Sequence, residues 1–372
     1  MQLRLVMICL TITLLFTIRA AASPYTAEEL LSGYITIVDE QGAIVFQTGL
    51  AVHPGDEFIS EDNKLYEVTT VEGNLARSRY TRDEQIAGLL DKAVIPVQGD
   101  ISPPQRISIY HTHTDESFIP TDGTSTQPGK GSIMKVGDAF DAKLTALGYQ
   151  VDHSITPHDP HDANAYQRSR RTFMKLLELQ PAALFDLHRD SAPLPVYQTT
   201  INGQDAAKIL LVVGRQNQNR ATTMNYAKTI KAATDSKYRG LIRGIFIAHG
   251  NYNQDLNPRA MLIEIGTQYN RREAAEYSAG LLAEVIPAVL TATAGHVAEA
   301  SPLPGSSSLL SDDLTPDGWG RDLAFLIGAV IAGSAAFLFL STGSVREAKQ
   351  KLRNFTTREW NDLFRLRRKR KN

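Results

Sequence analysis

Cysteine is almost absent from this chain of 372 residues, since Cys9 is the only one and lies in an apolar run near the N-terminus. The rest of the chain therefore has no disulfide, no thiol nucleophile and no thiolate ligand for a metal. The sequence also contains no internal repeat. Cysteine-based catalysis and cysteine-type zinc sites are thus excluded for the body of the protein.

Long apolar runs are confined to the two ends of the chain. Near the N-terminus, Arg4 precedes an apolar run at residues 5–18, and small residues follow at 20–23. This order is typical of a secretory signal peptide, assigned to residues 1–22, and the run is short for a membrane span. Because Arg19 interrupts the junction, an uncleaved anchor stays open as an alternative.

The second apolar run, residues 323–342, has 20 residues without a charge. About 20 apolar residues cross the hydrocarbon core of a bilayer as one helix. The tail that follows, residues 343–372, carries 11 Lys and Arg against 3 Asp and Glu, a net charge of +8. The positive-inside rule predicts a single-pass cell-membrane protein, with this tail in the cytoplasm and the preceding part outside.

Positive charge is scarce in the part of the chain that is predicted to be exported. The whole chain has a net charge of −1, and setting aside the tail and the two arginines of the signal leaves −11. An acidic domain gains nothing electrostatically from nucleic acid, so a nucleic-acid partner is disfavoured. The basic cluster RLRRKRK lies in the tail, where it fixes topology and contacts anionic lipid.

Two different patterns divide the exported part. Between residues 32 and 73, apolar and polar residues alternate between regular turn signals, which predicts a small all-β domain at residues 24–97. At residues 105–294, strand-like runs alternate with helix-like segments, which predicts an α/β domain with a mostly parallel sheet and flanking helices. The helix-like segments lie near residues 133–147, 165–179, 219–234 and 272–289. A linker rich in Pro, Ser and Gly, residues 295–320, would let this domain stand off the bilayer.

Polar, titratable residues follow three of the strand-like runs. The motifs are YHTHTDESF (residues 110–118), LFDLHRDS (184–191) and MLIEIGTQYN (261–270). Sites in such sheets lie where strands end and loops begin. A hydrolytic zinc site needs three ligands of the His or Glu type, one open position for water, and a further carboxylate that moves protons. A single histidine at a strand end is more often structural, so the combination of all three motifs favours such a site.

The alternation of side chains along a strand adds detail. His111 and His113 would share a face in extended backbone, and Asp186 would share a face with His188. Asp186 could therefore orient His188 as a hydrogen-bond acceptor. Glu264 follows three apolar residues, and a buried glutamate there costs free energy unless it is paired or takes part in catalysis.

Over roughly residues 107–290 the chain closely resembles the stage II sporulation protein P family. The resemblance rests on IYHTHTDESF, YQRSRRTFMKLLELQPAALFDLHRDS, LVVGRQNQN and YNQDLNPRAMLIEIGTQYN. It implies a membrane-anchored, zinc-dependent N-acetylmuramoyl-L-alanine amidase of peptidoglycan, with the fold of the zinc amidases. It also implies a role in engulfment during sporulation, with a lytic transglycosylase and other sporulation membrane proteins as partners. Family members usually look anchored by an N-terminal helix, whereas the anchor predicted here lies near the C-terminus.

The resemblance also implies roles for individual residues. His113, Glu116 and His188 would bind Zn²⁺, and Glu264 would act as general base and then general acid. The predicted substrate or oxyanion contacts are Arg189, Asn253, Gln254 and Arg259.

The identity of the second zinc ligand is left open between several residues. In the wider amidase group a glutamate begins the first helix, but the corresponding GSIMKVGDAF has none. Glu116 is the nearest candidate, and His161 or His158 is the alternative, although a solvated loop explains both histidines as well. His111 is expected beside a ligand or facing the substrate.

Two further functions stay open. A stem-peptide endopeptidase, alone or in addition to amidase activity, would use the same zinc ligands in a differently shaped cleft. A non-catalytic scaffold that binds the cell wall would keep the fold without the chemistry. The scaffold is disfavoured because every expected site position is filled.

Overall fold

The computed structural model describes residues 28–30, 32–86, 88–90, 105–162 and 164–297. The predicted signal peptide, transmembrane helix and basic tail lie outside the described residues, as does most of the predicted linker, and they stay predictions. Within the described part of the chain, no helix is long and apolar enough to cross a membrane.

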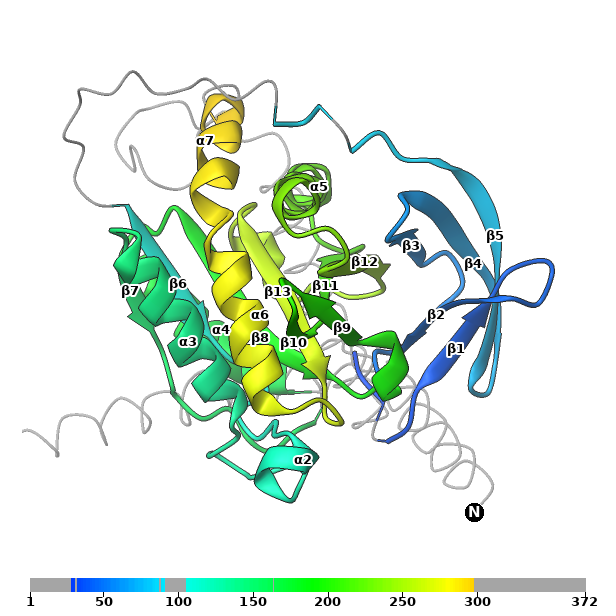
Figure 1. The fold of residues 1–372 in the computed structure, drawn as a ribbon, viewed down its shortest axis with the longest axis horizontal. Helices are drawn as coiled ribbons and strands as arrows, with labels where there is room; N and C mark the ends of the chain where they lie inside the picture. Colours follow the sequence, from blue (N-terminus) through cyan, green and yellow to red (C-terminus); the bar gives the residue numbers. More distant parts are fainter. Residues whose placement is uncertain (1–27, 31, 87, 91–104, 163, 298–372) are drawn as a thin grey trace, which may run out of the picture. The chain divides into compact units, whose positions relative to one another are not determined.

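An eleven-stranded sheet runs through the described residues (Figure 1), in the order β2-β1-β5-β4-β3-β12-β11-β13-β8-β6-β7. Its strands are β1 (Ile35–Val38), β2 (Ile44–Thr48), β3 (Glu57–Ser60), β4 (Lys64–Glu72), β5 (Leu75–Asp83), β6 (Arg106–Tyr110), β7 (Gln150–His153), β8 (Ala183–Asp190), β11 (Ile209–Gly214), β12 (Ile242–Ala248) and β13 (Ala260–Thr267). A second, two-stranded sheet pairs β9 (Gln198–Ile201) with β10 (Gln204–Ala207).

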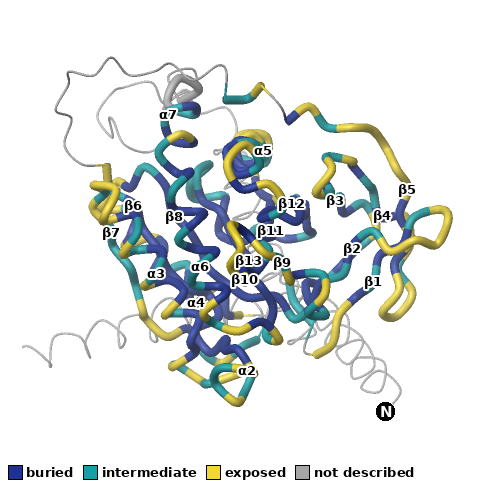
Figure 2. The backbone as a smooth tube through the Cα atoms, viewed as in Figure 1, coloured by how far each residue is buried: buried dark blue, intermediate teal, exposed yellow. Residues whose placement is uncertain are grey.

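The half of the large sheet from β12 to β7 has the mostly parallel arrangement that the sequence predicts. Four of its five strand pairs are parallel, and the exception is β11 with β13. Strands β8, β11, β12 and β13 are buried along their whole length (Figure 2), which explains their nearly continuous apolar runs.

Helices cover both faces of this half. The described helices are α2 (Ile119–Asp122), α3 (Ile133–Ala146), α4 (Ala165–Leu177), α5 (Arg220–Lys237), α6 (Arg272–Ala283) and α7 (Ile286–Val297), with short 3₁₀ turns at Leu194–Val196 and Gln254–Leu256. Of these, α3 to α7 cover the sheet. Helices α3, α5, α6 and α7 share one large core cluster with residues such as Ile109 of β6. Helix α4 packs on the opposite face, where Phe173 meets the next residue of β6, Tyr110, with ring centroids 5.7 Å apart.

The N-terminal strands join the same sheet. Strand β3 pairs antiparallel with β12, and Phe58 lies opposite Phe246. Phe46 of β2 stacks on Phe58 with ring centroids 4.1 Å apart, and the N-terminal strands share a core cluster with β11, β12 and β13. The small β domain predicted at residues 24–97 is therefore continuous with the sheet of the α/β region. At the other end, α7 extends to Val297, which is inside the predicted linker.

Gly244 pairs with Ser60 where β3 joins β12. A Cβ atom on Gly244 would lie 2.4 Å from the backbone oxygen of Ile59 and 2.5 Å from the ring of Phe58. Gly244→Ala should therefore lower the free energy of unfolding by roughly 2–5 kcal/mol, as measured by chemical denaturation. Gly280→Ala in α6 is the matched control, because nothing lies within 4 Å of the added Cβ there. It should leave stability unchanged or raise it by up to about 1 kcal/mol, and equal effects of both changes would contradict the close approach.

Candidate metal centre

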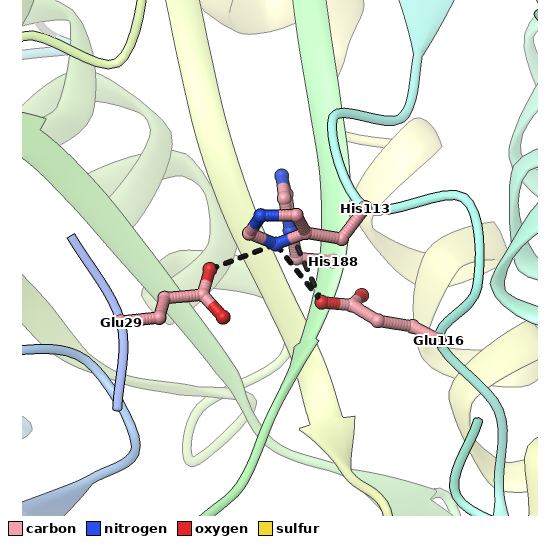
Figure 3. Close-up of side chains that lie close together, drawn as sticks. All are labelled: Glu29, His113, Glu116 and His188. Atoms are coloured by element: carbon pink, nitrogen blue, oxygen red, sulfur yellow. Dashed lines mark hydrogen bonds and ion pairs between the residues drawn. The ribbon is translucent and has the colours of Figure 1, made fainter. Parts of the chain in front are cut away.

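Four side chains converge at the carboxyl edge of the sheet, as Figure 3 shows. Each offers one nitrogen or oxygen atom, and these atoms all lie within 4.8 Å of one another. The four residues are Glu29, His113, Glu116 and His188. The two histidines and Glu116 are buried, and Glu29 is partly exposed.

The topology of the sheet explains how three of these residues meet. His188 lies near the end of β8, and His113 and Glu116 lie in the loop that follows β6. Strands β6 and β8 are parallel neighbours, so both end at the same edge of the sheet. The structure therefore brings together the three ligands that the resemblance implies.

Asp186 holds the loop after β6 against β8. The backbone N–H of Thr112 donates to Oδ1 of Asp186 at 2.8 Å, and the Thr112 hydroxyl donates to Oδ2 at 2.6 Å. Oδ1 also lies 3.0 Å from Nε2 of His188, whose other nitrogen faces Glu116. Asp186 thus occupies the outer position that orients a metal-binding histidine, as the strand alternation predicts.

The distances within the cluster suit a small dication. Oε1 of Glu116 lies 3.3 Å from Nδ1 of His188 and 3.5 Å from Nδ1 of His113. Ligands at about 2.0–2.2 Å from a tetrahedral zinc ion lie roughly 3.3–3.6 Å from one another. Oε1 of Glu29 lies 2.9 Å from Nδ1 of His113, yet neither atom makes a well-directed hydrogen bond within the described residues. Nδ1 of His188 and Oε1 of Glu116 form a long hydrogen bond of 3.3 Å, whereas the contact between Glu29 and His113 is poorly directed. Nitrogen and oxygen atoms that converge in this way fit a shared metal ion.

The charged groups of the cluster shift one another's pKa values. Burial alone would raise the pKa of Glu116, but the neighbouring histidines His188 and His113 bring that pKa below its usual value. Burial alone would lower the pKa of His188, but the carboxylates of Asp186 and Glu116 raise it well above its usual value. The carboxylates therefore keep protons on the imidazoles, and a bound dication would take the place of those protons.

The two alternative ligands, His158 and His161, are not members of the cluster, although His161 is in contact with it. Nδ1 of His158 lies 2.7 Å from the backbone oxygen of His111, and its Nε2 lies 2.7 Å from the Thr172 hydroxyl. Both ring nitrogens are therefore used in hydrogen bonds within the protein. His161 stacks on His113 with ring centroids 3.7 Å apart, and its Nδ1 lies 3.0 Å from Asp115. Of the three candidates for the second ligand, Glu116 is the one whose carboxylate lies in the cluster.

His111 faces away from the cluster. Its Nδ1 lies 2.9 Å from the backbone oxygen of Leu187, and its Nε2 lies 2.8 Å from Nε2 of His153. Burial, together with the charge of His153, lowers the pKa of His111 to about 3, so the ring is neutral. This histidine supports the strands beneath the site.

Glu264 lies beside the cluster on the neighbouring strand. Strand β13 is parallel to β8, and Glu264 is in register with His188. The carboxyl is almost fully buried, and its Oε2 has no hydrogen-bond partner among the described residues. Burial raises the pKa of Glu264 well above its usual value; the charge of His188 opposes this shift, and the carboxylate of Asp190 adds to it. An unpaired, buried carboxyl of this kind is suited to proton transfer.

A cavity of about 440 Å³ adjoins the cluster. Glu264 and Glu29 both line it, together with Arg189 and Gln268. The guanidinium of Arg189 is held in place because it donates to the backbone oxygens of Ser117 and Ser125. This cavity is the place in the described structure where a substrate would reach Glu264.

Three of the four predicted contact residues do not line this cavity. Asn253 donates to the backbone of α4, and Gln254 exchanges hydrogen bonds with the backbone of β11. Arg259 precedes β13 and donates to the backbone oxygen of Thr293 in α7. Because Arg259 lies at the amino end of β13, it is separated from the carboxyl edge where Glu264 lies.

Sequence reasoning missed Glu29. This residue is 84 positions before His113, in a short polar stretch without a motif, and only the three-dimensional fold brings the two side chains together. An isolated bridge between Glu29 and Leu50 places it there, and no local signal in the sequence predicts that contact.

Comparison with known proteins assigns the chain to a family. The family model of Stage II sporulation protein P (SpoIIP) matches residues 36–287, and the chain belongs to this family. A curated relative, Stage II sporulation protein P of Bacillus subtilis (strain 168), is 28% identical over 237 residues. The match covers 56% of this chain and 59% of that relative, which is less than two thirds of its length.

Several solved structures overlap with about half of the chain. The N-acetylmuramyl-L-alanine amidase Ami1 from Mycobacterium smegmatis gives a TM-score of 0.32 at 15% identity, covering 53% of this chain and 98% of that one. An N-acetylmuramoyl-L-alanine amidase from Clostridium difficile 630 gives 0.33 at 16% identity, covering 53% and 99%. The CwlD amidase from Clostridioides difficile, solved in complex with the GerS lipoprotein, gives 0.32 at 14% identity, covering 52% and 98%. The family assignment rests on the family model alone.

His188→Ala and Glu116→Gln should each weaken zinc binding, because each removes an atom that faces the centre of the cluster. The loss of affinity should exceed the roughly 10–100-fold that removal of an outer partner costs, as measured by competition with a chromogenic chelator. His249→Gln is the control: it removes a partly exposed histidine whose nitrogens lie near Arg215 and Gln216, outside the cluster. Equal zinc affinity in all three variants would show that the cluster does not hold the metal.

Proposed function

We propose that this protein is a peptidoglycan hydrolase, and specifically a zinc-dependent N-acetylmuramoyl-L-alanine amidase that removes stem peptides from glycan strands. Membership of the Stage II sporulation protein P family supports the hydrolase class and a role in sporulation. The observation that carries the proposal is the buried cluster of histidine and carboxylate groups next to Glu264, which lines the adjoining cavity.

The proposed ligands are the three residues that come from the edge of the parallel strands: His113, Glu116 and His188. When bound, zinc supplies a Lewis acid that polarises the amide carbonyl and lowers the pKa of water. Asp186 keeps His188 in the orientation that binding needs. Arg189 lines the cavity and offers a positive charge to the carbonyl oxygen or to a carboxylate of the peptide.

Glu264 is the proposed proton carrier. Burial raises the pKa of Glu264 above its usual value, and a carboxyl with a raised pKa is suited to act first as a general base and then as a general acid. It takes a proton from the attacking water and passes it to the amine of L-alanine as the amide bond breaks. Its lack of another hydrogen-bond partner in the described residues leaves the carboxyl free for this exchange.

The patterns at the two ends of the chain support a location for this activity. We place the catalytic region outside the cell membrane, anchored through residues 323–342, with the basic tail in the cytoplasm. Peptidoglycan is the proposed substrate. Membership of the family supports a role in sporulation. Engulfment is the proposed setting, and a lytic transglycosylase that works on the same polymer is a proposed partner.

Glu264→Gln should abolish most peptidoglycan hydrolysis while leaving zinc binding intact. The amide has nearly the shape of the carboxyl but cannot carry the proton, so the rate should fall by roughly 10²–10⁴-fold. Wild type, Glu264→Gln and the control His249→Gln would be compared on purified peptidoglycan, with fragments identified by mass spectrometry and zinc measured by elemental analysis.

The fragments decide between the activities. Free stem peptides that begin with L-alanine would establish the amidase, and peptides cut within the stem would establish an endopeptidase in its place. If the wild-type protein binds no zinc and releases no fragment, even with a lytic transglycosylase present, the remaining interpretation is a scaffold that binds the cell wall.

A further inference from the structure

Glu29 differs from the other members of the cluster in where it comes from. The other three belong to β8 and the loop after β6, whereas Glu29 precedes β1. Its Oε1 lies 2.9 Å from Nδ1 of His113, and its Oε2 lies 3.1 Å from Nε2 of His161. Its carboxylate is therefore directed into the cluster from a part of the chain that is remote in sequence.

Among the described residues, the segment that carries Glu29 is attached by two backbone hydrogen bonds and by Oε1 of Glu28, which accepts from the N–H of Asn251 at 3.4 Å. The backbone N–H of Leu30 donates to the oxygen of Gly49 at 2.9 Å, and the N–H of Ala51 donates to the oxygen of Glu28 at 3.0 Å. Gly49 is itself fixed to the end of β8, because its N–H donates to Oδ1 of Asp190 at 2.6 Å. A short bridge between two segments thus sets the position of Glu29 over the edge of the sheet.

Glu29 lies between the cluster and the cavity. It lines the cavity that Glu264 also lines, whereas His113, Glu116 and His188 are absent from the described lining. The side chains of those three residues are at most 2% exposed, while that of Glu29 is 18% exposed. Glu29 therefore covers the three proposed ligands on the side from which a substrate must approach.

We propose that Glu29 is a fourth ligand that closes the metal centre, and that the centre admits substrate only when residues 28–30 are displaced. A hydrolytic zinc site keeps one position open beside three protein ligands, and a fourth protein ligand gives the closed coordination of a structural site. The coordination part of this inference stands on the geometry of the cluster, and its consequence for hydrolysis rests on the proposed function.

The test uses cobalt(II) in place of zinc and azide as a small probe of an open coordination position. Wild type, Glu29→Gln, Glu29→Ala and Glu72→Gln would be loaded with Co²⁺ as full chains, and their visible spectra would be followed as azide is added. Glu72→Gln is the control, because it removes an exposed glutamate at the end of β4 that is outside residues 28–30 and absent from the described cluster and cavity lining.

Both Glu29 variants should bind azide at least about tenfold more tightly than wild type, because a site that is open less than about a tenth of the time binds a ligand correspondingly more weakly. The same variants should hold zinc less tightly in a chelator competition and should hydrolyse peptidoglycan faster when zinc is saturating. Glu72→Gln should match wild type in all three measurements. Glu29→Ala is included because the glutamine amide of Glu29→Gln could itself bind the metal, whereas alanine has no ligand atom.

Three results would overturn the inference. The first is equal azide binding by wild type and both Glu29 variants, and the second is loss of all metal from properly folded Glu29 variants. The third is slower hydrolysis by variants that do bind azide more tightly. Absence of hydrolysis in every protein, together with the expected azide difference, would instead refute the proposed hydrolase and leave Glu29 as a ligand, because azide binding involves no peptidoglycan.

Discussion

The site depends on three polar residues buried on one face of β8: Asp186, His188 and Asp190. Buried charges cost free energy unless they are paired, and each of these has a partner that fixes another part of the molecule. Asp186 binds Thr112 in the loop after β6, His188 faces the carboxylate cluster, and Asp190 binds Gly49 from the N-terminal strands. One strand therefore sets the relative positions of the segments that make up the centre.

Period-two and helical patterns predicted much of this arrangement. Helices near residues 133–147 and 165–179 are present as α3 and α4, and the predicted helix at 272–289 is divided into α6 and α7 at Glu284 and Val285, just before a proline. His113 and His188 were expected to lie close together because their motifs come at the ends of strands in a mostly parallel sheet, and local pattern is sufficient for that inference.

Long-range contacts were beyond such patterns. The pairing of β3 with β12 joins segments about 185 residues apart, and nothing in either strand specifies its neighbour. The contact of Glu29 with His113 likewise joins residues that are far apart in sequence and that no local pattern pairs. Asn253, Gln254 and Arg259 lie in a motif that resembles the family, but proximity in sequence to Glu264 does not place them in the cavity, because β13 carries its two ends to opposite edges of the sheet.

The contrast between β8 and residues 28–30 has a consequence for amide hydrogen exchange. A central strand that is buried along all eight of its residues exchanges only through rare, extensive opening, whereas a short segment with few backbone hydrogen bonds among the described residues exchanges through local opening. The centre joins both kinds of segment. Amide protons of β8 should therefore exchange much more slowly than those of residues 28–30.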